Sequence, residues 1–225
     1  MGHAAEARVA SAAQMVVSTP PPSAPLQSVS TVFARVKASL AIVVTSSELG
    51  TGFCVASTPV ASYYLTSQHV VGKNKTVIIF RQFPKLHKYI GTVVATGIDQ
   101  DPDLALVRVA APNIPRLALQ VAVPTEGDAV ITAGYPSAQY RLAAISGDLT
   151  PAVHLGTLSA VVNRGGLLEY DAQTLPGNSG GPLIDAHTGN VLGVVTWKIK
   201  ESTDANIALG IARVVVPFLR ANKMS

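Results

Sequence analysis

The sequence predicts an all-β protein built from many short strands. Of its 225 residues, 48% are apolar and only 13% are charged, which suits a well-packed globular fold. The apolar residues come in short bursts, with 18 glycines and 15 prolines between them. Short strands separated by turn residues are typical of a β-sandwich or of β-barrels, and barrels remove exposed sheet edges.

The first half of the chain opens with a segment of different composition. Residues 1–28 are rich in Ala, Ser and Pro, and they predict a flexible tail with some polyproline character. Residues 30–37 then predict a short capped helix, and residues 40–44 predict the first buried strand. Further strands are expected at residues 51–56, 63–66, 76–80, 91–98 and 104–109.

The second half repeats this organisation after a bridge. Residues 112–127 contain several prolines and a glycine and predict a connection between two β-subdomains. Strands are expected at residues 129–133, 153–162, 167–171, 183–184, 191–197 and 208–211. Residues 214–222 predict a short terminal helix, with Pro217 tolerated only in its first turn.

Charge and cysteine content exclude several function classes. The net charge is +4, and the Lys and Arg residues are scattered, so no nucleic-acid partner is expected. The single cysteine, Cys54, lies in an apolar stretch and predicts a buried, inert thiol. His87, His154 and His187 lack metal-ligand spacing, and no phosphate loop is present, so we expect neither metal nor cofactor. No stretch is long and apolar enough to span a membrane.

The sharpest chemical signal is a serine between glycines. Residues 175–183 read LPGNSGGPL and place Ser179 on a tight turn before an apolar strand. Acyl transfer needs a nucleophile that stands clear of its backbone, and N–H groups aimed at the developing oxyanion. Gly177 has the freedom to turn its N–H inward, so the 177–179 segment, with Asn178 in its middle, predicts an oxyanion hole. The competing interpretation is a glycine-rich hairpin turn with an incidental serine.

A histidine and an aspartate complete the pattern. His69 stands at the end of an apolar strand, and histidine is the side chain whose pKa suits a general base for serine. Asp103 follows an acidic loop and directly abuts an alternating strand, where it would be carried inside. Each residue alone has a structural explanation, but the order His69, Asp103, Ser179 matches one known chain order of catalytic triads.

Taken together, these segments resemble a known family. Residues 51–53 (TGF), 65–71 (LTSQHVV), 103–106 (DLAL), 134–136 (GYP), 156–160 (GTLSA) and 177–183 (GNSGGPL) are similar to the HtrA/Deg protease domain and related bacterial trypsin-like peptidases. The resemblance runs from residue 29 to residue 220. It implies a chymotrypsin-like fold of two six-stranded antiparallel β-barrels with short terminal helices, and an active site in the cleft between the barrels.

The resemblance also divides the chain and implies an activity. Residues 29–111 would form the N-terminal barrel, residues 112–127 the connection, and residues 128–225 the C-terminal barrel with its helix. The implied function is that of a serine endopeptidase acting on proteins or peptides through an acyl-enzyme, with His69, Asp103 and Ser179 as the triad. The family often carries a C-terminal PDZ domain, and this sequence ends before one, so we expect either a PDZ-less relative or an isolated protease domain. The trimerisation loops of the family are not matched, so the oligomeric state stays open.

Specificity residues are implied by the same alignment of motifs. The primary pocket would be lined by Gln173, Thr174, Val195, Thr196, Trp197 and Lys198. Nothing acidic lies at its base, which favours small or medium aliphatic side chains before the scissile bond, while Lys198 at the rim leaves acidic residues as an alternative. Thr196 also stands where the family places a residue near the catalytic aspartate. Because Asn178 is uncharged, no activation by a newly cut N-terminus is expected.

Two further hypotheses stay open beside the active protease. The chain could be a catalytically silent or ligand-activated peptide-binding module, or a protease whose oxyanion hole assembles only when a partner binds. An extracytoplasmic location, periplasmic or secreted, is favoured by the resemblance and by the Ala/Pro-rich tail.

Overall fold

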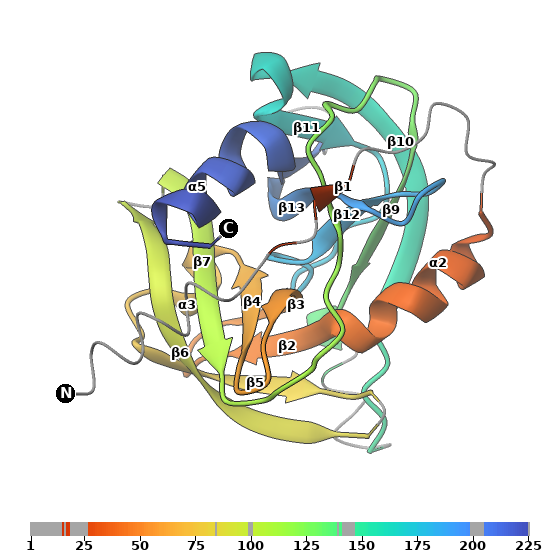
Figure 1. Ribbon diagram of the computed structural model, residues 1–225. Helices are drawn as coiled ribbons and strands as arrows, with labels where there is room; N and C mark the ends of the chain where they lie inside the picture. The colour runs from red at the N-terminus through yellow and green to blue at the C-terminus, as the bar shows by residue number, and fades with distance from the viewer. Residues whose placement is uncertain are drawn as a thin grey trace.

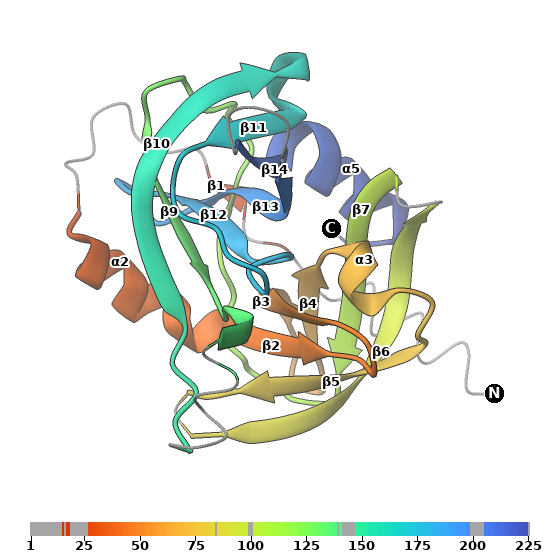
Figure 2. The same ribbon diagram turned by 180° about the vertical axis from the view of Figure 1, so that it is seen from behind.

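Two closed barrels of six strands each make up the body of the protein (Figures 1 and 2). The structure is a computed structural model, and it describes residues 15, 17–18, 27–83, 85–98, 101–138, 140, 147–198 and 205–224. The side chains of residues 98, 197 and 198 are outside this description. The predicted all-β, two-barrel fold class is confirmed.

The first barrel closes in the order β2-β3-β4-β7-β6-β5, with every neighbouring pair antiparallel. Its strands are β2 (Leu40–Val44), β3 (Leu49–Ser57), β4 (Ser62–Thr66), β5 (Thr76–Arg81), β6 (His87–Ile98) and β7 (Asp101–Val109). These strands match the predicted segments to within a few residues. The main difference is β6, which begins at His87, four residues before the predicted strand.

The second barrel closes in the order β13-β12-β9-β10-β11-β14, because β14 also pairs with β13. Its strands are β9 (Ala129–Gly134), β10 (Ala152–Val162), β11 (Leu167–Tyr170), β12 (Pro182–Asp185), β13 (Val191–Lys198) and β14 (Asn206–Gly210). Two short strands extend this sheet beyond the ring. β8 (Leu119–Gln120) pairs parallel with β13, and β1 (Val17–Ser18) pairs parallel with β8.

Strand β1 lies inside the segment for which the sequence predicts a flexible tail. Its Val17 pairs with Leu119, and the amide of Asn190 donates to the hydroxyl of Ser18 at 3.1 Å. A two-residue strand has no hydrophobic periodicity, so the sequence could not reveal it. Most of the remaining tail lies outside the described residues.

Short helices join and close the barrels. They are α2 (Val29–Val36), α3 (Gln68–Val71), α5 (Val216–Ala221), the 3₁₀ turns η1 (Lys37–Ser39) and η2 (Asn163–Gly165), and the π turn η3 (Ile211–Val215). The side chain of Ser28 caps α2 by accepting from the N–H of Thr31. The terminal helix α5 lies beside β7 of the first barrel (Figure 1). No helix among the described residues has the length and apolarity needed to cross a membrane.

Alternation along the strands divides the apolar side chains among separate cores. In β2, Ala41 and Val43 point into the first barrel, whereas Leu40 and Ile42 point out into a cluster shared with the second barrel. The second barrel has its own interior, which includes Val130, Leu158, Leu168, Leu183, Val195 and Ala208. The shared cluster therefore joins the barrels and fixes the relative position of the loops at their junction.

Candidate functional site

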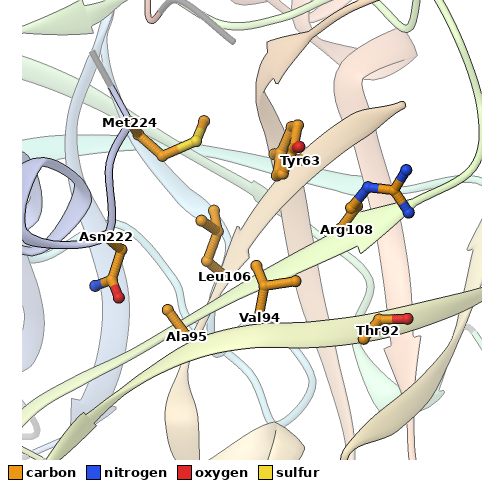
Figure 3. Close-up of a pocket in the computed structure, with 8 residues that line it drawn as sticks. All are labelled: Tyr63, Thr92, Val94, Ala95, Leu106, Arg108, Asn222 and Met224. Atoms are coloured by element: carbon orange, nitrogen blue, oxygen red, sulfur yellow. The ribbon is translucent and has the colours of Figure 1, made fainter. Parts of the chain in front are cut away.

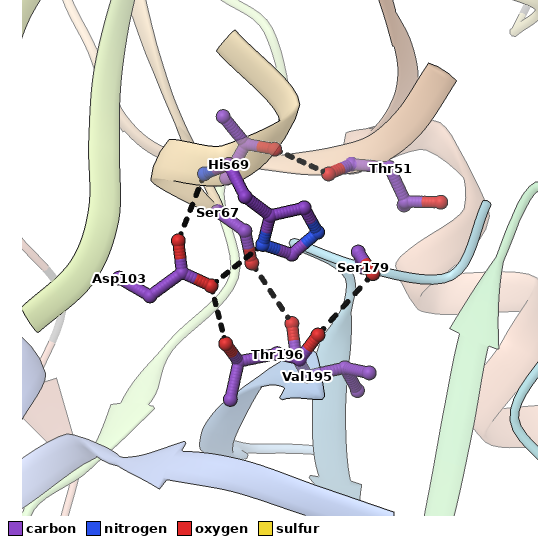
Figure 4. Close-up of polar contacts among 8 residues, drawn as sticks. Thr51, Ser67, His69, Asp103, Ser179, Val195 and Thr196 are labelled. Atoms are coloured by element: carbon purple, nitrogen blue, oxygen red, sulfur yellow. Dashed lines mark hydrogen bonds and ion pairs between the residues drawn. The ribbon is translucent and has the colours of Figure 1, made fainter. Parts of the chain in front are cut away.

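His69 lies in the helical turn α3, just beyond the end of β4. The predicted strand ends at Thr66, as β4 does, and His69 follows three residues later. Its backbone N–H donates to Oδ1 of Asp103 at 2.8 Å, and its Nδ1 lies 2.7 Å from Oδ2 (Figure 4). Because an ionised carboxylate can only accept, Nδ1 carries the proton and Nε2 keeps a free lone pair.

Asp103, in β7, is held in a nearly closed environment and is only 6% exposed. Besides the two bonds from His69, its Oδ2 accepts the hydroxyl of Thr196 in β13. Burial would raise the pKa of Asp103, but the hydrogen bonds from His69 and Thr196 outweigh it and hold that pKa below its ordinary value. The carboxylate is therefore ionised at neutral pH and can stabilise a protonated imidazole.

The pKa of His69 moves in the opposite direction. The hydrogen bond with Asp103 raises it above its ordinary value of 6.5, against burial, which lowers it. The charges of Asp103 and Glu48 add to the increase. A raised pKa makes Nε2 a stronger proton acceptor, and the side chain remains 37% exposed, so a substrate can reach it.

Ser179 lies in the loop between β11 and β12 and faces the edge of the imidazole ring that is turned away from Asp103 (Figure 4). Its hydroxyl donates to the carbonyl of Thr196 at 3.3 Å. Within the described part of the chain no hydrogen bond joins Ser179 to His69. Thr196 therefore contacts both partners, with its hydroxyl on Asp103 and its carbonyl on Ser179.

The loop before Ser179 leaves two backbone N–H groups open. Gly177 has a φ of 100°, and a Cβ there would lie 2.4 Å from the carbonyl oxygen of Tyr135, so only glycine fits. The N–H groups of Gly177 and Ser179 donate to no acceptor among the described residues. Asn178 differs from both, because its N–H donates to the carbonyl of Leu175 at 2.9 Å. Of the predicted 177–179 segment, the structure thus leaves the Gly177 and Ser179 amides open and engages that of Asn178.

Two hydrogen bonds hold the carbonyls of this loop away from the open amides. The carbonyl of Pro176 accepts the N–H of Ser137 at 2.8 Å, and the carbonyl of Gly177 accepts the hydroxyl of Thr51 at 2.7 Å. Had the Pro176–Gly177 peptide turned over, its carbonyl would occupy the space where an oxyanion must bind. The loop therefore has the orientation that oxyanion binding requires.

Thr51, at the beginning of β3, connects this loop to both barrels. Its N–H donates to the carbonyl of Ser179 at 2.8 Å, and its hydroxyl accepts from the N–H of Tyr135 at 2.9 Å while donating to Gly177. In the sequence, Thr51 stands out only as part of a segment that resembles the family. Its partner Gly177 lies 126 positions away, so no local pattern could have assigned it this role.

The predicted specificity residues are spread over two environments. Gln173 is exposed, and the hydroxyl of Thr174 lies 3.0 Å from that of Tyr170. Val195 is buried in the interior of the second barrel, while its carbonyl accepts the N–H of Gly180 at 2.7 Å. The side chains of residues 197 and 198 lie outside the described part of the structure.

A cleft of about 450 Å³ opens beside these groups. Its described lining comprises Val44, Thr45, Ser46, Ser47, Glu48, Leu49, His69, Ser137, Tyr140, Pro176, Gly177 and Ser179. The cleft thus runs from the β2–β3 hairpin of the first barrel to the serine loop of the second. A substrate placed here would contact the imidazole and the open amides together.

Other features of the described residues offer less chemistry. A hollow of about 280 Å³ lies on β4, β6 and β7 beneath the C-terminal segment, and Arg108 is the charged residue in its described lining (Figure 3). It shares no residue with the cleft. Burial raises the pKa of the Cys54 thiol to about 12, which fits the predicted inert role. Among the described residues, no group of His, Cys, Asp and Glu is placed to hold a metal ion.

Known proteins share this sequence pattern. The sequence model of the trypsin-like peptidase domain matches residues 50–194. The chain is 31% identical over 161 residues to the serine protease Do-like HtrB of Bacillus subtilis, covering 67% of this chain and 33% of that protein. It is 31% identical over 186 residues to the probable periplasmic serine endoprotease DegP-like of Chlamydia pneumoniae, covering 78% of this chain and 33% of that protein. It is also 28% identical over 173 residues to the serine endoprotease DegS of Escherichia coli, covering 72% of this chain and 44% of that protein.

Solved structures share the fold. The serine endoprotease from Yersinia pestis superimposes with a TM-score of 0.70 at 24% identity, over 90% of this chain and 68% of that one. The HtrA-type protease AlgW with tripeptide superimposes with a TM-score of 0.69 at 23% identity, over 84% of this chain and 62% of that one. At such identities the likeness concerns the fold alone. The chain spans less than half the length of the curated relatives described above.

Proposed function

The chain belongs to the trypsin-like peptidase family, and from that premise we propose that it is a serine endopeptidase of the HtrA type. In this proposal Ser179 is the nucleophile, His69 the general base, and Asp103 the carboxylate that orients His69. The observation that carries the proposal is the double hydrogen bond from His69 to the ionised Asp103, beside a serine loop with two open amides.

The proposed mechanism follows from these contacts. Nε2 of His69 takes the proton of the Ser179 hydroxyl while Oγ bonds to the carbonyl carbon of the substrate. The N–H groups of Gly177 and Ser179 stabilise the oxygen that becomes negative. His69 then gives its proton to the leaving nitrogen as the C–N bond breaks. A water molecule, deprotonated by His69, hydrolyses the acyl-enzyme and restores the Ser179 hydroxyl.

Substrates and location belong to the same proposal. The substrates are proteins or peptides with a small or medium aliphatic side chain before the scissile bond. The location is extracytoplasmic, and the name of the Chlamydia relative, a probable periplasmic endoprotease, supports this. Fractionation of the native cells that recovered the protein with cytoplasmic markers would contradict the location.

One observation supports a second candidate, a peptide-binding module that is silent or needs a ligand. The Ser179 hydroxyl rests on the Thr196 carbonyl at 3.3 Å, and it has no bond to His69 in the described structure. A bound peptide that displaced the hydroxyl from Thr196 would then be needed for activation. In the active-protease proposal, rotation about one single bond is sufficient.

Reaction with a fluorophosphonate probe separates the two candidates. The purified chain is treated with the probe and measured by intact mass, beside a Ser179→Ala control. The protease proposal expects a single adduct on the chain and none on the control. A folded chain that stays unlabelled would overturn it and favour the ligand-activated or silent module.

A further inference from the structure

The cleft beside Ser179 lies where one half of a peptide substrate would bind. Its described lining contains none of the residues predicted to hold the side chain before the scissile bond. In the proposed mechanism Nε2 of His69 protonates the leaving nitrogen, so the leaving half must lie on the His69 side of Ser179. The cleft has His69 in its wall and therefore receives the residues that follow the scissile bond.

A fixed negative charge stands at the rim of this cleft. Glu48 lies at the tip of the β2–β3 hairpin, and its side chain is exposed. The described lining contains no lysine or arginine, and Glu48 forms no ion pair within the described part of the chain. An unpaired carboxylate beside a concave surface attracts cationic groups of a substrate.

The hairpin fixes the backbone that carries this charge. The N–H of Glu48 donates to the hydroxyl of Thr45 at 2.9 Å, and the N–H of Thr45 donates to the carbonyl of Glu48 at 2.9 Å. The turn therefore holds the backbone of Glu48 at the cleft. The charge of Glu48 also contributes to the raised pKa of His69, so its field reaches the reacting groups.

The remainder of the lining suits a long side chain with a cationic end. Val44 and Leu49 supply apolar surface at the hairpin, and Tyr140 adds an aromatic ring to the lining. Lysine and arginine bury their methylene stems on apolar surface and keep their charge at a polar rim. An aromatic ring adds attraction for a cation that reaches its face.

We infer, on the basis of the proposed function, that the cleft selects substrates with lysine or arginine at the first or second position after the scissile bond. Glu48 is the residue that determines this specificity. The inference concerns the leaving half of the substrate and is separate from the aliphatic preference proposed for the residue before the bond.

The test uses internally quenched peptides that differ only after the scissile bond. Each carries valine before the bond and lysine, alanine or glutamate at the two positions that follow, and mass spectrometry verifies the cleavage site. kcat/KM is measured for the unmodified chain, for Glu48→Gln and for Glu48→Lys. Glu169→Gln is the matched control, because it removes the same charge from β11, outside the cleft.

The expected ratio of kcat/KM values corresponds to the free energy of an exposed ion pair. The unmodified chain and Glu169→Gln should cleave the lysine peptide about two- to fivefold faster than the alanine peptide, and the glutamate peptide most slowly. Glu48→Gln should remove most of this difference, and Glu48→Lys should reverse the order. Salt at about 1 M should weaken the preference, because it screens exposed charges. Equal cleavage of all three peptides, or a preference that survives in Glu48→Gln, would overturn the inference.

A binding measurement keeps the inference testable if no peptide is cleaved. Fluorescence anisotropy then compares the three peptides on Ser179→Ala and on the double variant that also carries Glu48→Gln. Tighter binding of the lysine peptide that depends on Glu48 would support a subsite for basic side chains, even if the proposed catalytic activity had failed. Equal binding of all three peptides would overturn the inference as well.

Discussion

At the scale of single residues, Thr196 links the groups that would have to act together. Its hydroxyl donates to the buried Asp103, and its carbonyl accepts the hydroxyl of Ser179. Asp103 in turn binds both the backbone N–H and the ring of His69. Because the carboxylate holds the ring in one orientation and one tautomer, it sets the protonation behaviour of the whole site.

The first prediction concerns the pH dependence of the reaction. A general base must be neutral, so kcat/KM should fall as the pH drops through the pKa of His69 in the free enzyme. The hydrogen bond with Asp103 raises that pKa, so the acid limb should lie above pH 6.5, the ordinary value for histidine. Asp103→Asn should move the limb to lower pH and reduce kcat by roughly 10⁴, because the ring loses its tautomer and its stabilising charge.

Initial rates across the acid and neutral range would measure this. An Asp103→Asn variant that loses only a few-fold in kcat and keeps its acid limb would contradict the role proposed for the carboxylate. Asp171→Asn is a suitable control, because that exposed carboxylate accepts the N–H of Thr157 away from the cleft.

The residues named above differ in how far sequence could predict them. His69, Asp103 and Ser179 stand in short segments whose residue types indicate chemistry, and the structure brings all three to the junction of the barrels. Thr51 and Ser137 have no such local signal. Their hydrogen bonds to the serine loop depend on the distance between elements far apart in the sequence.

At the scale of elements, strand β3 acts as the support of the serine loop. Its third residue, Thr51, donates hydrogen bonds to the carbonyls of both Gly177 and Ser179, although the strand belongs to the other barrel. Gly180 packs equally closely, since a Cβ there would lie 2.2 Å from the hydroxyl oxygen of Thr66 in β4. The orientation of the open amides is therefore a property of two elements in contact, and the loop does not set it alone.

The second prediction tests this support. Thr51→Val keeps the shape of the side chain but leaves the Gly177 carbonyl and the Tyr135 N–H without their buried partner. We expect kcat to fall by roughly 10²–10³, as when an oxyanion donor is lost, with KM nearly unchanged. Thr51→Ser should restore most of the rate, because it restores the hydroxyl.

The control for this variant is Thr76→Val, an exposed strand position with no side-chain hydrogen bond in the described structure. Steady-state kinetics and the rate of fluorophosphonate labelling would be measured together. A Thr51→Val enzyme with an unchanged labelling rate would contradict the view that β3 sets the oxyanion geometry.

The length of a secondary-structure element decides whether the sequence can predict it. The longer strands were predictable, because runs of Val, Leu and Ile between turn residues indicate strands whatever their partners. Helix α3 and strands β1 and β8 have only four, two and two residues, so their sequences are too short to show a repeating hydrophobic pattern. Strands β1 and β8 form because neighbouring strands offer them backbone partners, and the side chain of Asp103 holds the backbone of α3 through the N–H of His69.

At the scale of the whole molecule, the apolar cluster between the barrels is the dominant feature. It includes Leu40 and Phe53 of the first barrel, Ile131 and Leu209 of the second, and Val32 of α2. All of these side chains are almost fully buried. Two barrels that share so much buried apolar surface are expected to unfold together.

The third prediction is therefore a single unfolding transition. The fluorescence of the only tryptophan, on β13 of the second barrel, should change at the same temperature as the far-UV circular dichroism of the whole chain. Ile131→Ala should lower that temperature by roughly 4–20 °C for both signals, because it leaves a cavity in the shared cluster. Two separate transitions, or a shift in one signal alone, would refute the idea of one cooperative unit.

The same apolar cluster would hold the two barrels together if a protease cut the connection between them. The chain crosses from one barrel to the other through residues 110–118, where Asn113, Pro115 and Arg116 are exposed to solvent and offer the place where a protease, including another copy of this one, would cut. Since the barrels are held by buried side chains and not by this peptide link, a clipped molecule would keep both halves of its site together. It would elute at the size of the intact protein and keep working, and only a denaturing gel would reveal the cut.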